Sequence, residues 1–104
     1  MKTGRKTKMF SDKVYKLLTR VPRGRVTTYK ELAKAVGCRA YRAVGNALNK
    51  NRDPVGVPCY RVVRSDGTLG GYSKGLKKKV GLLKKDGIVI REGKINLKKY
   101  GFEF

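Results

Sequence analysis

The chain has 104 residues, and its 27 lysines and arginines against 7 aspartates and glutamates give a formal net charge of +20. A chain of this length forms one domain with a modest core, and such an excess of positive charge favours a polyanionic partner, with nucleic acid as the first candidate. Histidine is absent and cysteine occurs only at Cys38 and Cys59, which excludes a cysteine–histidine hydrolase and both histidine-ligated and four-thiolate zinc sites within one chain. We therefore expect neither a metal nor a cofactor.

The first residues are basic but precede no apolar signal region, and no segment is long and apolar enough to span a bilayer. We expect a monomer that is cytoplasmic, associates with DNA and keeps its thiols reduced. We divide the chain into a flexible basic arm, residues 1–9, and one DNA-binding domain, residues 10–104. A membrane surface is the weaker alternative partner, because no amphipathic helix carries large aromatic anchors.

A first helix is predicted to start at Ser11, which is a suitable N-cap, and to end before Pro22. Apolar residues recur along it at helical spacing: Phe10, Val14, Leu17, Leu18 and Val21. Residues 22–25 form a turn, and the short Val26–Thr27 segment favours a strand.

The next segment predicts two helices joined by a tight turn. Thr28 and Glu31 are spaced as in a capping box, so the first helix starts at Thr28, and Gly37 suits the residue after its end. The second helix covers residues 40–49, and its apolar stripe consists of Ala43, Val44, Ala47 and Leu48. Such a pair is a helix-turn-helix, whose second helix can enter a DNA groove. The pattern alone is weakly specific, and the positive charge is what favours DNA binding.

Small residues make the second helix thin on one side: Ala40, Ala43, Gly45 and Ala47. A thin helix can lie close to DNA, even in a minor groove that is too narrow for bulky side chains. Arg42 lies near the start of this helix, from where it could reach into the duplex.

Residues 57–63, Val-Pro-Cys-Tyr-Arg-Val-Val, form what we call the thiol segment. They follow a polar loop, residues 49–56, whose turn formers are Asn51, Asp53 and Pro54. β-branched residues flank the thiol segment and Pro58 fixes the backbone before Cys59, so we expect an extended segment that holds one thiol in a fixed place. Free cysteines usually act as small buried hydrophobic residues, so Cys59 by itself indicates no chemistry.

A glycine-rich loop, residues 69–75, follows a tight turn at residues 64–68. Glycines let the backbone approach a ligand closely, so this loop predicts one wall of a pocket with Tyr72 and Ser73 as its polar groups. An ordinary flexible loop is the alternative.

A helix over residues 75–85 comes next, with its core residues at Leu76, Val80 and Leu83. Its outer face is predicted to carry Lys77, Lys78, Lys79, Lys84 and Lys85. A short hairpin around Glu92–Gly93 follows, and Tyr100 and Phe102 supply two aromatic rings to the core. The sequence thus predicts a mainly α fold with small β elements, namely a single winged-helix-like domain with a helix-turn-helix, a C-terminal helix and a short hairpin.

Several segments together resemble a known family: residues 21–24 with 28–33, 42–47, 57–63 and 71–75. In order and nearly in spacing they are similar to the DNA-binding domain of O6-alkylguanine-DNA alkyltransferases, and the resemblance extends from about Phe10 to Gly87. The family's active-site signature reads Pro-Cys-His-Arg-Val. Its members move an alkyl group from O6 of a flipped guanine to a thiolate in one irreversible step. A base inside a duplex is out of reach, so such chemistry requires the base to leave the stack.

The resemblance implies a role for each matching residue. Cys59 would accept the alkyl group, and Arg42 would fill the space that the flipped base leaves. Tyr29 would help to rotate the nucleotide and then contact the guanine. Asn51 would hold the thiol segment, and Ser73 would bond O6. Further residues are implied in DNA contact or in the base pocket: Ala43, Gly45, Arg61, Val62 and Tyr72.

Two positions depart from the family pattern. Tyr60 stands where members usually carry the histidine that deprotonates the thiol, and Asp86 stands in place of the glutamate that supports this histidine. A phenol with an ordinary pKa of ~10 is a poor base at neutral pH. We therefore expect transfer that is slow or favours alkaline pH.

The chain also lacks the N-terminal domain of most full-length alkyltransferases, and here and in its terminal hairpin it resembles the alkyltransferase-like proteins. Those proteins flip alkylated guanine and flag it for other repair machinery, but they typically lack the acceptor cysteine. Three functions remain open: alkyl transfer to Cys59, lesion binding without transfer, and architectural binding of DNA through charge. We favour transfer because the nucleophile is retained, and the expected partners are duplex DNA that contains O6-alkylguanine and other repair proteins.

Overall fold

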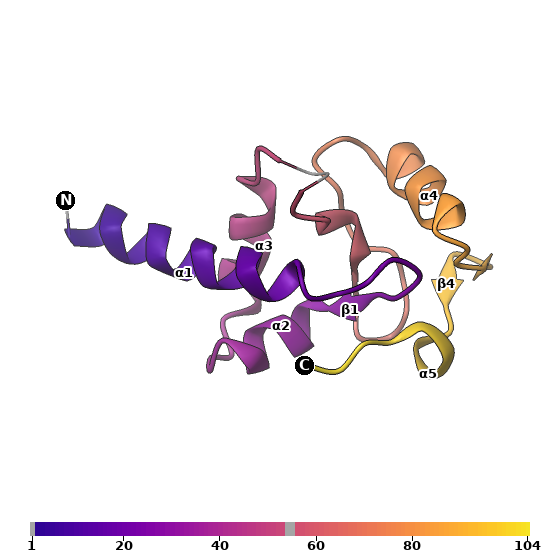
Figure 1. Cartoon of the computed structure of the whole chain (residues 1–104), viewed down its shortest axis with the longest axis horizontal. Coiled ribbons are helices and arrows are strands. Elements are labelled where there is room, and N and C mark those ends of the chain that lie inside the picture. The colour runs from indigo at the N-terminus through magenta and orange to yellow at the C-terminus, as the bar shows by residue number, and fades with distance from the viewer. Residues whose placement is uncertain (1, 54–55) are drawn as a thin grey trace.

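The computed structural model describes residues 2–53 and 56–104, with side chains from residue 9 onward. The helices are α1 (Lys2–Leu18), α2 (Tyr29–Ala35), α3 (Tyr41–Asn49), α4 (Leu76–Lys85) and α5 (Leu97–Tyr100). Two-residue strands and one 3-10 helix complete the fold (Figure 1): β1 (Thr27–Thr28), β2 (Val62–Val63), β3 (Ile90–Arg91), β4 (Lys94–Ile95) and η1 (Cys59–Arg61). The predicted mainly α fold with small β elements is confirmed.

Helix α1 starts earlier than the sequence indicated. It begins at Lys2, and Ser11 lies buried inside it, so the predicted N-cap at Ser11 is wrong. Residues 2–9 are helical where a flexible arm was expected. Once Val14 and Leu18 are packed, each further turn adds hydrogen bonds without a new nucleation cost, and lysine and arginine favour helix. Phosphate contact by this basic stretch stays a prediction.

The helix-turn-helix forms as predicted. Thr28 is the N-cap of α2, and its hydroxyl accepts a hydrogen bond from the Glu31 N–H at 3.0 Å. Gly37 has φ +83°, the left-handed conformation that glycine supplies after a helix end. Helix α3 then begins at Tyr41 with Ala40 as its N-cap.

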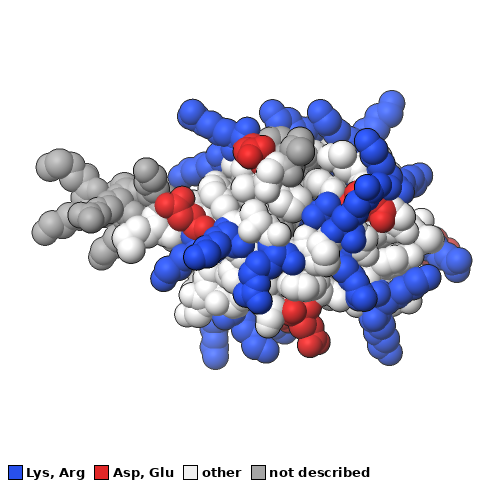
Figure 2. Space-filling model, in the orientation of Figure 1, with Lys and Arg blue, Asp and Glu red and all other residues white. Residues whose placement is uncertain are grey.

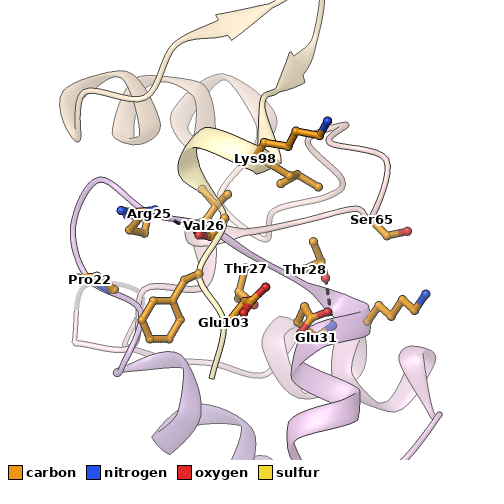
Figure 3. A pocket seen from close by; sticks show the side chains of 13 residues that line it. Pro22, Arg25, Val26, Thr27, Thr28, Glu31, Ser65, Lys98 and Glu103 are labelled. Carbon is orange, nitrogen blue, oxygen red and sulfur yellow. Dashed lines mark hydrogen bonds between the residues drawn. The ribbon is translucent and has the colours of Figure 1, made fainter.

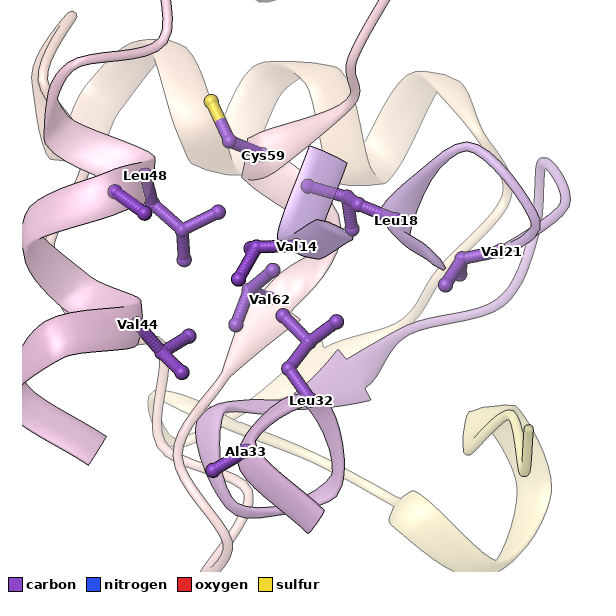
Figure 4. Close-up of a cluster of buried hydrophobic side chains, with 10 residues drawn as sticks. Val14, Leu18, Val21, Leu32, Ala33, Val44, Leu48, Cys59 and Val62 are labelled. Carbon is purple, nitrogen blue, oxygen red and sulfur yellow. The ribbon is translucent and has the colours of Figure 1, made fainter. Parts of the chain in front are cut away.

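The first core cluster joins α1, the two helices of the helix-turn-helix and β2 (Figure 4). Its buried residues are Val14, Leu18, Val21, Leu32, Ala33, Val44, Ala47, Leu48, Cys59 and Val62. Cys59 lies at the edge of this cluster in Figure 4. The Tyr15 hydroxyl donates a hydrogen bond to the Ala47 carbonyl at 2.6 Å, which links α1 to α3. The packing therefore fixes α3 relative to the thiol.

A parallel pairing of β1 with β2 brings the start of α2 next to the thiol segment. Thr27 pairs with Val62 and Thr28 with Val63. Tyr29 directly follows β1 and Cys59 closely precedes β2, so this short ladder brings their backbones together across a long sequence separation.

The predicted turn former Pro54 lies outside the described residues.

The second core cluster joins α4 and the C-terminal hairpin to the back of the thiol segment. Its buried residues are Val26, Tyr60, Val63, Leu69, Leu83, Ile88, Ile95 and Tyr100. Strands β3 and β4 pair antiparallel around the predicted turn at Glu92–Gly93.

Helix α4 is rotated relative to the prediction. Leu76, expected in the core, is 52% exposed, whereas Lys79, expected on the outer face, is 0% exposed. Residues four apart share a helix face, so Lys79 points inward together with Leu83. The other four lysines of α4 are exposed, as predicted.

Lysine and arginine side chains are spread over the whole visible face of the molecule in Figure 2, with few acidic side chains between them. The charge alone therefore does not mark one DNA-binding surface on this face. Among the described residues, no helix has both the length and the apolar character needed to cross a membrane.

Candidate functional site: the Cys59 pocket

The thiol segment is a turn followed by a strand, and the prediction of an extended segment throughout is wrong for Cys59–Arg61. Pro58 has φ −77°, which suits the start of a helical turn, and its carbonyl accepts a hydrogen bond from the Arg61 N–H at 3.0 Å. Upstream, the Asn51 amide donates to the Val57 carbonyl at 2.8 Å. Asn51 thus contacts the backbone two residues before the thiol, and its role in holding the thiol segment stays a prediction.

A cavity of about 290 Å³ opens beside Cys59. Its lining residues come from α2, α3, the thiol segment and the glycine-rich loop: Tyr29, Tyr41, Gly45, Leu48, Asn49, Cys59, Arg64, Gly71, Tyr72 and Ser73. We call this cavity the Cys59 pocket. It is at the small end of the range of ligand pockets, about 300–1,000 Å³. The structure thus brings together five residues that the sequence singled out: Tyr29, Gly45, Cys59, Tyr72 and Ser73.

Other predicted site residues lie outside this lining. Arg42 is exposed on α3 and Ala43 is half-buried. Val62, implied in the base pocket, is fully buried, and its carbonyl accepts a hydrogen bond from Lys79 Nζ at 2.7 Å. The Arg61 side chain is 15% exposed and donates to the Val21 carbonyl at 2.9 Å. This placement does not support direct DNA contact by Arg61.

Several lining residues were missed by the sequence analysis. Tyr41 and Asn49 lie four residues before and after the predicted Gly45 on α3, so all three face the pocket. This spacing is present in the sequence, but the small residues of the same helix indicate a close approach to DNA and not a pocket wall. Arg64 had no such signal, because it follows a strand within an irregular segment.

Behind the thiol, the Tyr60 hydroxyl donates to Asp86 Oδ2 at 2.5 Å and accepts from Arg61 Nε at 3.1 Å. Arg23 Nε lies 3.4 Å from the other carboxylate oxygen of Asp86. Burial raises the pKa of Tyr60, and the hydrogen bond to Asp86 raises it further. Tyr60 therefore keeps its proton at neutral pH and holds it against Asp86, which leaves no phenolate to deprotonate the thiol.

Two of the three phenols that line the pocket, Tyr29 and Tyr72, are also protonated at neutral pH. Burial raises the pKa of Tyr72. Burial also raises the pKa of Tyr29, and this effect is larger than the lowering by the positive charge of Arg64. Both hydroxyls can thus donate hydrogen bonds to a molecule in the pocket, as can the hydroxyl of Ser73.

The glycine-rich loop approaches Tyr29 most closely at Gly70. A Cβ at this position would lie 3.0 Å from Tyr29 Oη and 3.2 Å from Tyr29 Cε2, and Gly70 has φ +70°. We predict that Gly70→Ala lowers the free energy of unfolding by about 1–2 kcal/mol, because both the contact and the conformation disfavour a side chain. The matched control is Gly71→Ala, where a Cβ meets nothing within 4 Å. Equal denaturant midpoints for the two variants would contradict this account.

A larger cavity lies elsewhere in the described part of the chain (Figure 3). It measures about 890 Å³ and lies between β1, the start of α2 and the C-terminal segment, with Thr27, Glu31, Lys98 and Glu103 among its lining residues. It contains neither a thiol nor a phenol. Volume therefore does not single out the Cys59 pocket, whereas the presence of a thiol does.

Comparison of the sequence and the fold with known proteins shows the family to which the chain is similar. The family model of the 6-O-methylguanine DNA methyltransferase DNA-binding domain matches residues 9–88. A bifunctional methyltransferase/endonuclease of Picrophilus torridus is 50% identical over 90 residues, which are 86% of this chain and 30% of that protein. The chain thus spans less than a third of the length of this relative.

Two solved structures share the fold. Schizosaccharomyces pombe Atl1, in complex with damaged DNA that contains O6-carboxymethylguanine, superposes with a TM-score of 0.84 at 31% identity, over 93% of this chain and 97% of that one. The O6-methylguanine-DNA methyltransferase of Pyrococcus kodakaraensis superposes with a TM-score of 0.71 at 48% identity, over 76% of this chain and 46% of that one. From the family match and these similarities, the chain belongs to the family of the 6-O-methylguanine DNA methyltransferase DNA-binding domain.

Proposed function

We propose that this chain binds duplex DNA through α2 and α3, receives an O6-alkylguanine base in the Cys59 pocket and takes the alkyl group onto Cys59 Sγ. One observation carries this proposal. The thiol lines a cavity whose other walls are the second helix of the helix-turn-helix and the glycine-rich loop. A base swung out of a duplex by that helix would therefore arrive beside the sulfur.

The transfer step balances without a cofactor. Sγ attacks the alkyl carbon, a C–S bond forms, the C–O6 bond breaks and its electron pair stays on O6. The thiol proton is released to water, and the guanine takes up one proton as it leaves. Hydrogen bonds from Tyr29, Tyr72 or Ser73 would stabilise the charge that develops on the leaving purine. The product thioether is stable, so each chain reacts once.

On the DNA side, Arg42 supports this proposal through its position. It is exposed in the first turn of α3, and Gly45, one turn further along, lines the pocket. Extrusion of a base costs a few kcal/mol and favours a side chain that occupies the vacated space. Solved structures similar to this chain, Atl1 among them, are complexes with DNA, which supports DNA as the partner of this chain.

A second candidate is lesion binding without transfer, in which the chain marks O6-alkylguanine for other repair proteins. Two observations favour it. The Tyr60 hydroxyl is occupied by Asp86, so the thiol has no general base among the described residues at that position. Atl1, which superposes on this chain with a TM-score of 0.84, is in complex with damaged DNA that contains O6-carboxymethylguanine.

One experiment separates these candidates. The chain is mixed with a duplex that carries a single O6-methylguanine, and both the affinity relative to undamaged duplex and the intact mass of the protein are measured. A mass gain of one methylene that is absent in Cys59→Ser and present in Cys38→Ser supports transfer. Lesion-selective binding with no mass gain supports the second candidate. Salt-sensitive binding with no preference for the lesion would refute both.

A further inference from the structure

Lys79 is fully buried, which is rare for a lysine. Its ammonium donates to three backbone carbonyls: Val62 at 2.7 Å, Leu69, and Gly71 at 3.0 Å. A buried ammonium is tolerated only when its hydrogen bonds are satisfied, and here three carbonyls supply one acceptor for each N–H. None of these acceptors belongs to α4, the helix that carries Lys79.

The three acceptors belong to the two segments that carry Cys59 and the pocket hydroxyls. Val62 directly follows the turn that carries Cys59, while Leu69 and Gly71 lie in the glycine-rich loop that continues into Tyr72 and Ser73. A loop this rich in glycine has high conformational freedom, and two hydrogen bonds to one fixed ammonium restrict it. Lys79 thus joins the part of the pocket that holds the nucleophile to the part that holds the hydroxyls.

We propose that Lys79 is a positioning residue that sets the distance between Cys59 and the glycine-rich loop and thereby shapes the pocket for a flipped base. This inference rests on the proposed function. Lys79 does not line the pocket and need not touch the base, because it acts through the carbonyls that it holds.

The charge of Lys79 suits the same role. Burial lowers the pKa of Lys79 to about 8, while the nearby Cys59 raises it and Arg64 lowers it further. At neutral pH the ammonium therefore keeps all three N–H groups that the carbonyls require.

The test compares Lys79→Met with Lys78→Met, an exposed position on the same helix that loses the same charge. Both changes are made in a Cys59→Ser background, so that binding is measured without transfer. We expect Lys79→Met to weaken lesion binding by at least ~10-fold, about 1.4 kcal/mol. Its affinity for undamaged duplex should match that of Lys78→Met. Equal losses of lesion affinity in the two variants would overturn the proposal.

Hydrogen exchange of the free protein gives a second readout that does not depend on DNA. Amides of residues 69–73 should exchange faster in Lys79→Met than in Lys78→Met, while those of α1 and α3 stay unchanged. A uniform increase over the whole chain would indicate general destabilisation and refute a positioning role. If the chain shows no lesion preference, the proposed function fails, but this comparison still decides whether Lys79 orders the loop.

If Lys79→Met does not fold, the unsubstituted chain decides the question by NMR. One lysine ammonium should be protected from exchange with water and show scalar couplings across its hydrogen bonds to the carbonyl carbons of Val62, Leu69 and Gly71. Lysine ammonium groups that all exchange as exposed ones do would overturn the proposal.

Discussion

Tyr60→His should accelerate alkyl transfer to Cys59 by about 10²-fold or more, because it restores a general base beside the thiol. In the present chain the Tyr60 hydroxyl donates to Asp86 and its pKa is raised, so it holds its proton at neutral pH. An imidazole in this place can donate one N–H to Asp86 and use its other nitrogen to take a proton from the thiol, directly or through a water. Asp86 would then orient the base.

The measurement is the single-turnover rate of methyl transfer from an O6-methylguanine duplex between pH 6 and pH 9. Without a base, only the fraction of thiol that ionises by itself reacts, so the unsubstituted chain should gain rate as the pH rises toward the pKa of Lys79, about 8. Above that pH the ammonium that holds the glycine-rich loop loses its proton, and the gain should stop. Tyr60→His should flatten this profile above the pKa of the new imidazole. Tyr60→Phe is the matched control, since it removes the hydroxyl and adds no base. A rate for Tyr60→His no higher than that for Tyr60→Phe would show that the base is not what limits transfer.

Arg42→Ala should weaken binding to lesion-bearing duplex by about 10- to 100-fold, because extrusion of a base costs a few kcal/mol that an inserted side chain offsets. The affinity for undamaged duplex should fall only by the contribution of a single phosphate contact. The matched control is Arg39→Ala, which removes another exposed guanidinium just before α3.

Fluorescence of a 2-aminopurine placed opposite or beside the lesion reports unstacking directly. Binding of the unsubstituted chain and of Arg39→Ala should raise this fluorescence, and Arg42→Ala should raise it much less. If Arg42→Ala and Arg39→Ala behave alike in both affinity and fluorescence, Arg42 acts through its charge and not as an inserted side chain.

The features that local sequence signals determine were predicted well. Thr28 and Glu31 specify the start of α2, and Gly37 specifies its end, because capping depends on residues only a few positions apart. The same holds for the turn at Glu92–Gly93. Residue types indicated that Tyr72 and Ser73 would line a pocket, and the family resemblance implied that this pocket contains Cys59; all three residues line one cavity in the structure.

The features that depend on long-range packing were not predicted. Lys79 was assigned to the outer face of α4 because four other lysines share that helix and a lysine usually avoids burial. Its acceptors are the backbone carbonyls of Val62, Leu69 and Gly71. Every residue has a backbone carbonyl, so the sequence does not show which carbonyls will accept a hydrogen bond. The same reason explains the turn at Cys59–Arg61, where a hydrogen bond to the Pro58 carbonyl overrides the strand preference of the flanking valines.

The most direct test of alkyl transfer is to locate the alkyl group after the chain has reacted with an equimolar duplex carrying one O6-methylguanine. Peptides from the digested protein are analysed by mass spectrometry. We predict one methyl group per chain, carried by the peptide that contains Cys59, with Cys38 unmodified and with the duplex converted to unmodified guanine. An unmodified Cys59 after full occupancy of the pocket, or a methyl group on Cys38, would contradict this prediction.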